Sequence, residues 1–317
     1  MGIDARARVS SAPTWQPEIA YAYLMDNVEP RTTGRQTSPS PALPAQFRAI
    51  AGPLAMLLAL AAAGLSAAPQ GVNVPDDEVA LIGALDDARA GRAEAALQRL
   101  EALVERNPNF RLAQLVYADL LLARSGHIGG FGAAVNGTGE RLEGLRAEVL
   151  ARLSHYRSQP AVDRMPAPLL QIAPSQRRVL MVDQAHSRLY MFENVNGQPR
   201  LVGDYYVSTG KKGARKEREG DQRTPVGVYF ITTRLAREEL DDFYGAGALP
   251  VNYPNEWDER YGRTGYGIWI HGVPSDTYSR PPRASDGCLA LPNGDLAPML
   301  GSLDIGSTPV VIADRVE

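Results

Sequence analysis

Cysteine is almost absent from this 317-residue chain, which contains one, Cys288. A lone cysteine excludes a disulfide within the chain, and in an oxidising compartment it is either a reactive thiol or an inert buried one. One cysteine and four scattered histidines also lack the spacing of a metal site. Charge of one sign is not in large excess, because the formal net charge is −3. The sequence therefore predicts no general attraction to nucleic acid or to an anionic membrane.

One uncharged apolar run, IAGPLAMLLALAAAGLSAA, occupies residues 50–68. Arg48 precedes it and the acidic stretch VPDDE follows it, a charge order that directs its C-terminal side outward. The small residues at 66–68 are similar to a signal-peptidase site, so we expect a signal peptide, with a membrane anchor or a buried helix as alternatives. An export segment or anchor predicts a periplasmic or cell-envelope location. Residues 1–49, which include a Pro, Ser and Thr-rich stretch, are expected to be disordered or to precede the true start.

Residues 76–159 show helical periodicity. Apolar residues fall on one face of the segment 92–106, which stops at Asn107-Pro108, and again on one face of 110–124. Two helices broken by Asn-Pro, with alanines at packing positions, resemble a tetratricopeptide-type (TPR-like) hairpin. One and a half such units are too few for a solenoid. A plain helical hairpin and a module that binds a protein partner are both open interpretations.

The character of the chain changes near residues 160–172, and residues 172–317 are expected to form a second domain. Six short runs of β-branched and aromatic residues are separated by turn residues, with little helix between them. This pattern predicts a mainly β domain, a sandwich or a barrel. The runs are 177–183, 187–194, 201–210, 226–233, 266–272 and 308–314.

The surroundings of Cys288 favour a nucleophile. A catalytic thiol needs a base, donors for an oxyanion and an exposing turn. Gly287 permits unusual dihedral angles there, and consecutive backbone N–H groups at such a turn can form an oxyanion hole. His271 ends the strand-like run GYGIWIHG, where catalytic groups are commonly presented, so we expect it to be the general base. The other histidines, His127, His155 and His186, are expected on the surface or on a helix face.

The segment IHGVPSDTYSRPPRASDGCLALPN, residues 270–293, resembles the active-site signature of the L,D-transpeptidase (YkuD-like) catalytic domain. That signature has His-Gly at a strand end, a loop of similar length, Ser-His-Gly-Cys and a short apolar-Arg run. Upstream, STGKKG (208–213) and TPVGVYFI (224–231) are similar to the hairpin of that family. The resemblance covers residues 176–314 and leaves the helical part out.

The resemblance implies an enzyme that acts on peptidoglycan stem peptides in cell-wall organisation and cell shape, without a cofactor. It implies that His271 takes the thiol proton and that Cys288 attacks the carbonyl of the third residue and expels D-alanine. Backbone N–H groups around Gly287 and Cys288 would hold the oxyanion, and Ser285 belongs to the same motif. An amine acceptor makes a transpeptidase, and water makes a carboxypeptidase or another hydrolase. An inactive wall-binding scaffold is the alternative of another class.

Two positions depart from the family pattern: Asp286 replaces a second His, and Ala290 replaces an Arg. A carboxylate two residues from the thiol raises its pKa unless a cation neutralises it. One hypothesis is that Arg280 or Arg283 pairs with Asp286 and takes over carboxylate recognition from the missing Arg. The alternative is that these are solvated loop charges.

The segment 240–267, rich in aromatics, glycine and paired charges, comes just before the His271 strand. We expect it to line the cleft, although packing of its aromatics onto the domain is equally open. The candidate substrate walls are Tyr244, Tyr253, Trp257 and Tyr261, and Gly272 is placed with the candidate substrate-binding residues.

Overall fold

The computed structural model describes residues 71–127, 129–135, 139–158, 169 and 172–316. The predicted disordered start and the apolar run at 50–68 lie outside these residues. Within the described part, no helix is long and apolar enough to cross a membrane.

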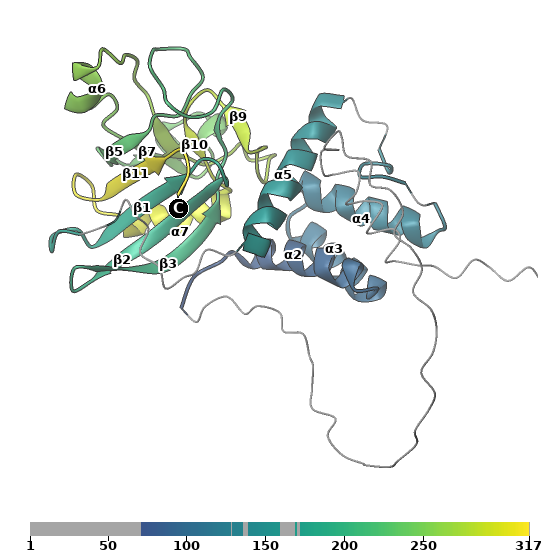
Figure 1. The fold of residues 1–317 in the computed structure, drawn as a ribbon. Coiled ribbons are helices and arrows are strands. Elements are labelled where there is room, and N and C mark those ends of the chain that lie inside the picture. The colour runs from purple at the N-terminus through teal and green to yellow at the C-terminus, as the bar shows by residue number, and fades with distance from the viewer. Residues whose placement is uncertain (1–70, 128, 136–138, 159–168, 170–171, 317) are drawn as a thin grey trace, which may run out of the picture.

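Among the described residues, four helices form the N-terminal region, which confirms the predicted helical character of residues 76–159 (Figure 1). Their bounds are α2 Asp76–Arg89, α3 Ala93–Arg106, α4 Arg111–Arg124 and α5 Gly139–Ser158. Three acidic residues in the first turn of α2 favour its start there, because they complement the positive end of the helix dipole. The helices bury a common aliphatic core that includes Leu81, Leu85, Leu97, Leu100, Leu103, Leu112 and Val116.

The C-terminal part is mainly β, as predicted, and each of the six expected runs contains a strand. A five-stranded sheet has the order β3-β2-β1-β11-β5, and a four-stranded sheet has the order β10-β8-β7-β6. A third, two-stranded sheet pairs β4 with β9. The first sheet comprises β1 Arg178–Asp183, β2 Arg188–Val195, β3 Gln198–Tyr206, β5 Gly227–Phe230 and β11 Pro309–Ala313. The other strands are β4 Thr209–Gly210, β6 Leu235–Ala236, β7 Gly247–Pro250, β8 Trp269–His271, β9 Arg283–Ser285 and β10 Leu289–Ala290.

The main core of this domain lies between the two larger sheets and includes helix α7 (Asn293–Ser302). Alternation along β1 explains how one strand serves two cores, since Leu180 and Val182 face this core whereas Val179 and Met181 face a second apolar cluster. Two short 3₁₀ helices, η1 Arg237–Glu239 and η2 Asp242–Tyr244, and the short helix α6 Glu256–Arg260 lie in the long segment before β8.

Buried charges join the helical region to the β domain. This seam network consists of Glu78, Glu148, Arg152, His155, Arg188 and Asp204. Arg152 on α5 pairs with Glu78 and lies 2.8 Å from Glu148, and Arg188 on β2 lies 2.8 Å from both Glu78 and Asp204. Burial raises the pKa of Glu78, but the two arginine charges outweigh it and the pKa ends below its usual value. Glu78 and the two arginines are therefore held charged, whereas burial raises the pKa of Glu148 above its usual value.

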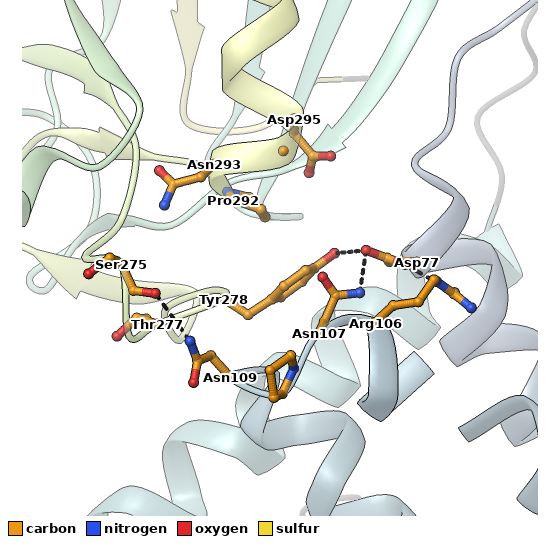
Figure 2. A pocket seen from close by; sticks show the side chains of 12 residues that line it. Asp77, Arg106, Asn107, Asn109, Ser275, Thr277, Tyr278, Pro292, Asn293 and Asp295 are labelled. Carbon is orange, nitrogen blue, oxygen red and sulfur yellow. Dashed lines mark hydrogen bonds and ion pairs between the residues drawn. The ribbon is translucent and has the colours of Figure 1, made fainter. Parts of the chain in front are cut away.

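A second set of contacts fastens the loop between β8 and β9 to the helices (Figure 2). The ring of Tyr278 stacks on Phe110 with 3.9 Å between centroids, and its hydroxyl donates to Asp77. Asn109 donates to the carbonyl of Ser275 at 3.1 Å. A cavity of about 280 Å³ lies between these contacts and the start of α7. The loop that connects the two predicted catalytic residues thus rests on the helical region.

Replacing Arg152 with Ala is expected to lower the free energy of unfolding by about 3–5 kcal/mol, because the buried Glu148 then loses its cation and Glu78 keeps only Arg188. Urea unfolding of the full chain measures this. The control is Arg200→Ala, which removes an exposed ion pair with Glu193 and should cost less than about 1 kcal/mol. Equal, small losses for the two variants would contradict the seam network as a structural tie.

Candidate active site

Parallel pairing of β8 with β10 brings the two predicted catalytic residues together. His271, the last residue of β8, is in register with Ala290, the last residue of β10. Cys288 immediately precedes β10, so it is two positions from Ala290. Because side chains alternate along a strand and paired residues share a face, Cys288 and His271 fall on one side of this sheet. The buried Leu289 and Ile270 face the core on the other side.

His271 is buried and held in one tautomer. Its Nδ1 lies 2.6 Å from the carbonyl oxygen of Gly272. A carbonyl only accepts, so Nδ1 carries the proton and Nε2 is left as an acceptor. The pKa of His271 is lowered to about 4, mainly by burial; the hydrogen bond to Gly272 opposes this shift and the charge of Arg280 adds to it. The rings of Phe243 and Tyr244 pack beside the imidazole. At neutral pH the side chain is therefore an uncharged base.

Cys288 is a partly buried thiol whose Sγ donates to the carbonyl oxygen of Gly267 at 3.3 Å. Burial raises its pKa, Arg280 opposes the rise and Asp286 adds to it. Within the described residues, no hydrogen bond links Sγ to His271. Catalytic hydrogen bonds often close only when substrate is bound. The free protein thus holds a neutral thiol and a neutral imidazole on one face.

The hydroxyl of Ser285 fixes the turn that precedes Cys288. Ser285 Oγ donates to the carbonyl oxygen of Cys288 at 2.6 Å and accepts from the N–H of Gly287 at 3.1 Å. Gly287 has a φ of +133°, and a Cβ there would lie 2.7 Å from the carbonyl oxygen of Arg223. Only glycine fits this turn without strain.

Thr224 ties this turn to the neighbouring sheet, a role that sequence reasoning missed. Its buried Oγ1 donates to the carbonyl oxygen of Gly287 at 3.0 Å and accepts from the N–H of Gly210 at 2.8 Å. Thr224 lies in the motif TPVGVYFI, which was the only signal available. Gly287 lies 63 residues after Thr224, and a contact over that separation cannot be predicted from one sequence.

Asp286 is exposed and pairs with Lys211 at 3.0 Å and with Gln222 at 2.9 Å. The hydrogen bond from Lys211 is the main cause that lowers the pKa of Asp286. The hypothesis that Arg280 or Arg283 pairs with Asp286 is therefore wrong, because Lys211 takes that place. Arg283 is exposed on β9, and its side chain has no partner among the residues described.

Arg280 is a cation whose charge acts on both members of the proposed catalytic pair. Its guanidinium carbon lies 4.3 Å from the centroid of the Phe243 ring, and its charge shifts the pKa values of His271, Cys288 and Asp286. Burial lowers the pKa of Arg280 itself. Ala290, which stands in place of the family Arg, is buried against this site.

The four residues expected as substrate walls lie in different surroundings. Tyr253 is 5% exposed in the main core and its hydroxyl donates to the carbonyl of Thr264, so its interpretation as a substrate wall is wrong. Tyr244 does pack against His271. Trp257 and Tyr261 are exposed and pair with each other, with no described contact to His271 or Cys288.

Gly272 is required by close packing. A Cβ on it would lie 2.1 Å from Oδ1 of Asn293 and 2.8 Å from the N–H nitrogen of Ala246. Asn293 Oδ1 accepts from Ala246 at 2.9 Å and from Val273 at 3.1 Å, which clamps the segment after His271. The expected role of Gly272 in substrate binding stays a prediction, and Asn293 is a further residue that the sequence did not reveal.

Comparison with known proteins agrees with this geometry. Residues 177–312 match the L,D-transpeptidase catalytic domain family, YkuD. No curated protein matches the chain.

The chain is similar to several solved structures. One is Bd1075 of Bdellovibrio bacteriovorus, which is 33% identical to this chain, with a TM-score of 0.43. That match covers 49% of this chain and 55% of Bd1075. The helical cell shape determining protein Pgp2 from Campylobacter jejuni has 28% identity, 47% and 51% coverage, and a TM-score of 0.43. An L,D-transpeptidase from Stackebrandtia nassauensis has 13% identity, 76% and 90% coverage, and a TM-score of 0.38. The chain spans about half the length of the first two proteins. The family match thus covers the β-rich part of the chain, residues 177–312, which is similar to the L,D-transpeptidase catalytic domain of the YkuD family.

Proposed function

We propose that the chain is a cysteine-dependent L,D-transpeptidase that acts on peptidoglycan stem peptides in the cell envelope. The observation that carries the proposal is the parallel pairing of β8 with β10, which puts Cys288 and His271 on one face. The fixed tautomer of His271 supports it, because Nε2 is the free acceptor that a general base needs.

In the first half-reaction, His271 Nε2 accepts the proton of Cys288 Sγ as the sulfur attacks the carbonyl carbon of the third stem residue. An S–C bond forms, and collapse of the tetrahedral intermediate breaks the C–N bond to D-alanine. The imidazolium returns its proton to the leaving amine. Because thiol and imidazole are both neutral beforehand, proton transfer accompanies the attack.

In the second half-reaction an amine attacks the thioester, His271 takes its proton, and Sγ leaves and is reprotonated. The oxyanion is assigned to the backbone N–H groups of Gly287 and Cys288. In the free protein the Gly287 N–H bonds to Ser285 Oγ, so it exchanges this bond for the substrate oxygen. Ser285 is a positioning residue in this scheme.

Arg280 is assigned to a carboxylate of the donor peptide. The family Arg is replaced by Ala290, and Arg280 is the half-buried cation whose charge reaches both catalytic residues. Burial of a cation costs free energy unless an anion accompanies it, so a carboxylate ligand suits this position.

The test is incubation of the purified chain with a disaccharide-tetrapeptide, followed by mass spectrometry, with Cys288→Ala alongside. We expect loss of D-alanine and formation of a crosslinked dimer, both abolished by the substitution. Loss of D-alanine without a dimer would contradict transpeptidation and favour a carboxypeptidase. No Cys288-dependent change would contradict the enzyme altogether and favour a wall-binding scaffold.

The pH profile of kcat/KM tests His271 as the base. A base works when neutral, and the pKa of His271 is lowered to about 4, so activity should fall to half only near pH 4. An ordinary histidine would place this limb near pH ~6.5. Arg280→Gln removes a positive charge that disfavours the imidazolium, so its acidic limb should move to higher pH. A limb near pH 6.5 in the parent protein would contradict the buried base.

A further inference from the structure

An exposed aromatic pair lies outside the proposed cleft. Trp257 and Tyr261 are 58% and 63% exposed, and their ring centroids are 4.9 Å apart. Trp257 lines a groove of about 590 Å³ between α6 and β5, a size within the usual range for ligand sites. Neither Cys288 nor His271 lines this groove.

The rim of the groove combines apolar rings with polar side chains that have free hydrogen-bonding groups. The side chains of Glu256, Glu259 and Arg260 line it and form no hydrogen bond or ion pair with any described residue. Two carboxylates and one guanidinium next to an exposed indole offer both donors and acceptors beside a flat apolar surface. A sugar ring presents the complement, an apolar face of C–H groups with hydroxyl and amide groups around its edge.

The groove is closed to a peptide that would add as a strand, although β5 is the outer strand of its sheet. Asn252 accepts from the N–H of Phe230 at 2.7 Å and donates its own N–H to the Phe230 carbonyl at 3.1 Å. Asn255 donates to the carbonyl of Val228 at 3.0 Å. Because these edge groups are already bonded, strand addition has little left to pair with.

The segment that carries the aromatic pair leads directly to the thiol. Arg263 forms an ion pair with the buried Asp258 at 2.6 Å, which fixes the chain beyond α6. Four residues later Gly267 accepts the hydrogen bond of Cys288 Sγ. In Figure 1, α6 lies at the corner of the β domain away from the helical region.

We propose that this groove binds the glycan strand of peptidoglycan, with an N-acetylated sugar ring stacked on Trp257. Tyr261, which packs on Trp257 but does not itself line the groove, extends the aromatic surface. The inference rests on the proposed function for its choice of polymer. In this proposal the sugar binds between α6 and β5, and the stem peptide binds in the cleft at Cys288.

The experiment measures binding of peptide-free glycan strands to the full chain carrying Cys288→Ala, by isothermal titration calorimetry. Adding Trp257→Ala should weaken binding about tenfold or more, as expected for an aromatic anchor. Trp257→Phe keeps a ring and should retain most of the affinity. Ile305→Ala, which truncates another exposed apolar side chain outside the groove, should change nothing. Thermal unfolding of each variant checks that it folds.

Absence of glycan binding by the parent protein, or equal binding by the Trp257→Ala variant, would overturn the inference. A free stem tetrapeptide is the second ligand, and a loss of its affinity as large as that for glycan would place the peptide in the groove instead. These binding measurements need no turnover. A failure of the proposed acyl transfer is therefore seen separately in the D-alanine assay.

Discussion

The proposed chemistry depends on the parallel pairing of two short strands, β8 and β10, which positions Cys288 and His271. β8 and β10 are three and two residues long, yet their register decides that Cys288 and His271 share a face. A shift of one residue would turn one of these side chains into the core. Several contacts maintain this register: Thr224 holds Gly287, Ser285 closes the turn, and Asn293 clamps the chain after His271.

The electrostatics of the pair follow from its burial. A buried imidazole with a lowered pKa and a partly buried thiol with a raised pKa remain neutral together, so neither member of the pair carries a charge before substrate arrives. Lys211 neutralises Asp286, which keeps that carboxylate from opposing thiolate formation further. Arg280 is the cation proposed for a substrate carboxylate, and the loop that carries it is fastened to the helical region through Tyr278. The helices thus contribute to the site without supplying a catalytic group.

The sequence predicted the β-rich fold and the preceding helices, because local patterns carry that information. A linear motif was enough to predict Cys288 and His271 as a catalytic pair, and that pairing stays a prediction. It did not predict Thr224 or Asn293 as positioning residues, or Lys211 as the partner of Asp286, because these contacts join distant segments. Tyr253 was misread for a related reason: an aromatic residue in a polar, glycine-rich segment looks like loop surface, whereas here it is packed against Tyr229 in the core. The buried seam network was equally hidden, since its charges look solvated until the two regions pack.

Trapping of the acyl-enzyme tests the central claim most directly. The chain would be mixed with a disaccharide-tetrapeptide, quenched in acid within seconds and digested for peptide mass spectrometry. The account predicts a thioester adduct on the peptide that contains Cys288, with the mass of the donor less D-alanine, and a much smaller adduct in His271→Gln. Turnover of the substrate without an adduct on Cys288, or an undiminished adduct in His271→Gln, would contradict it.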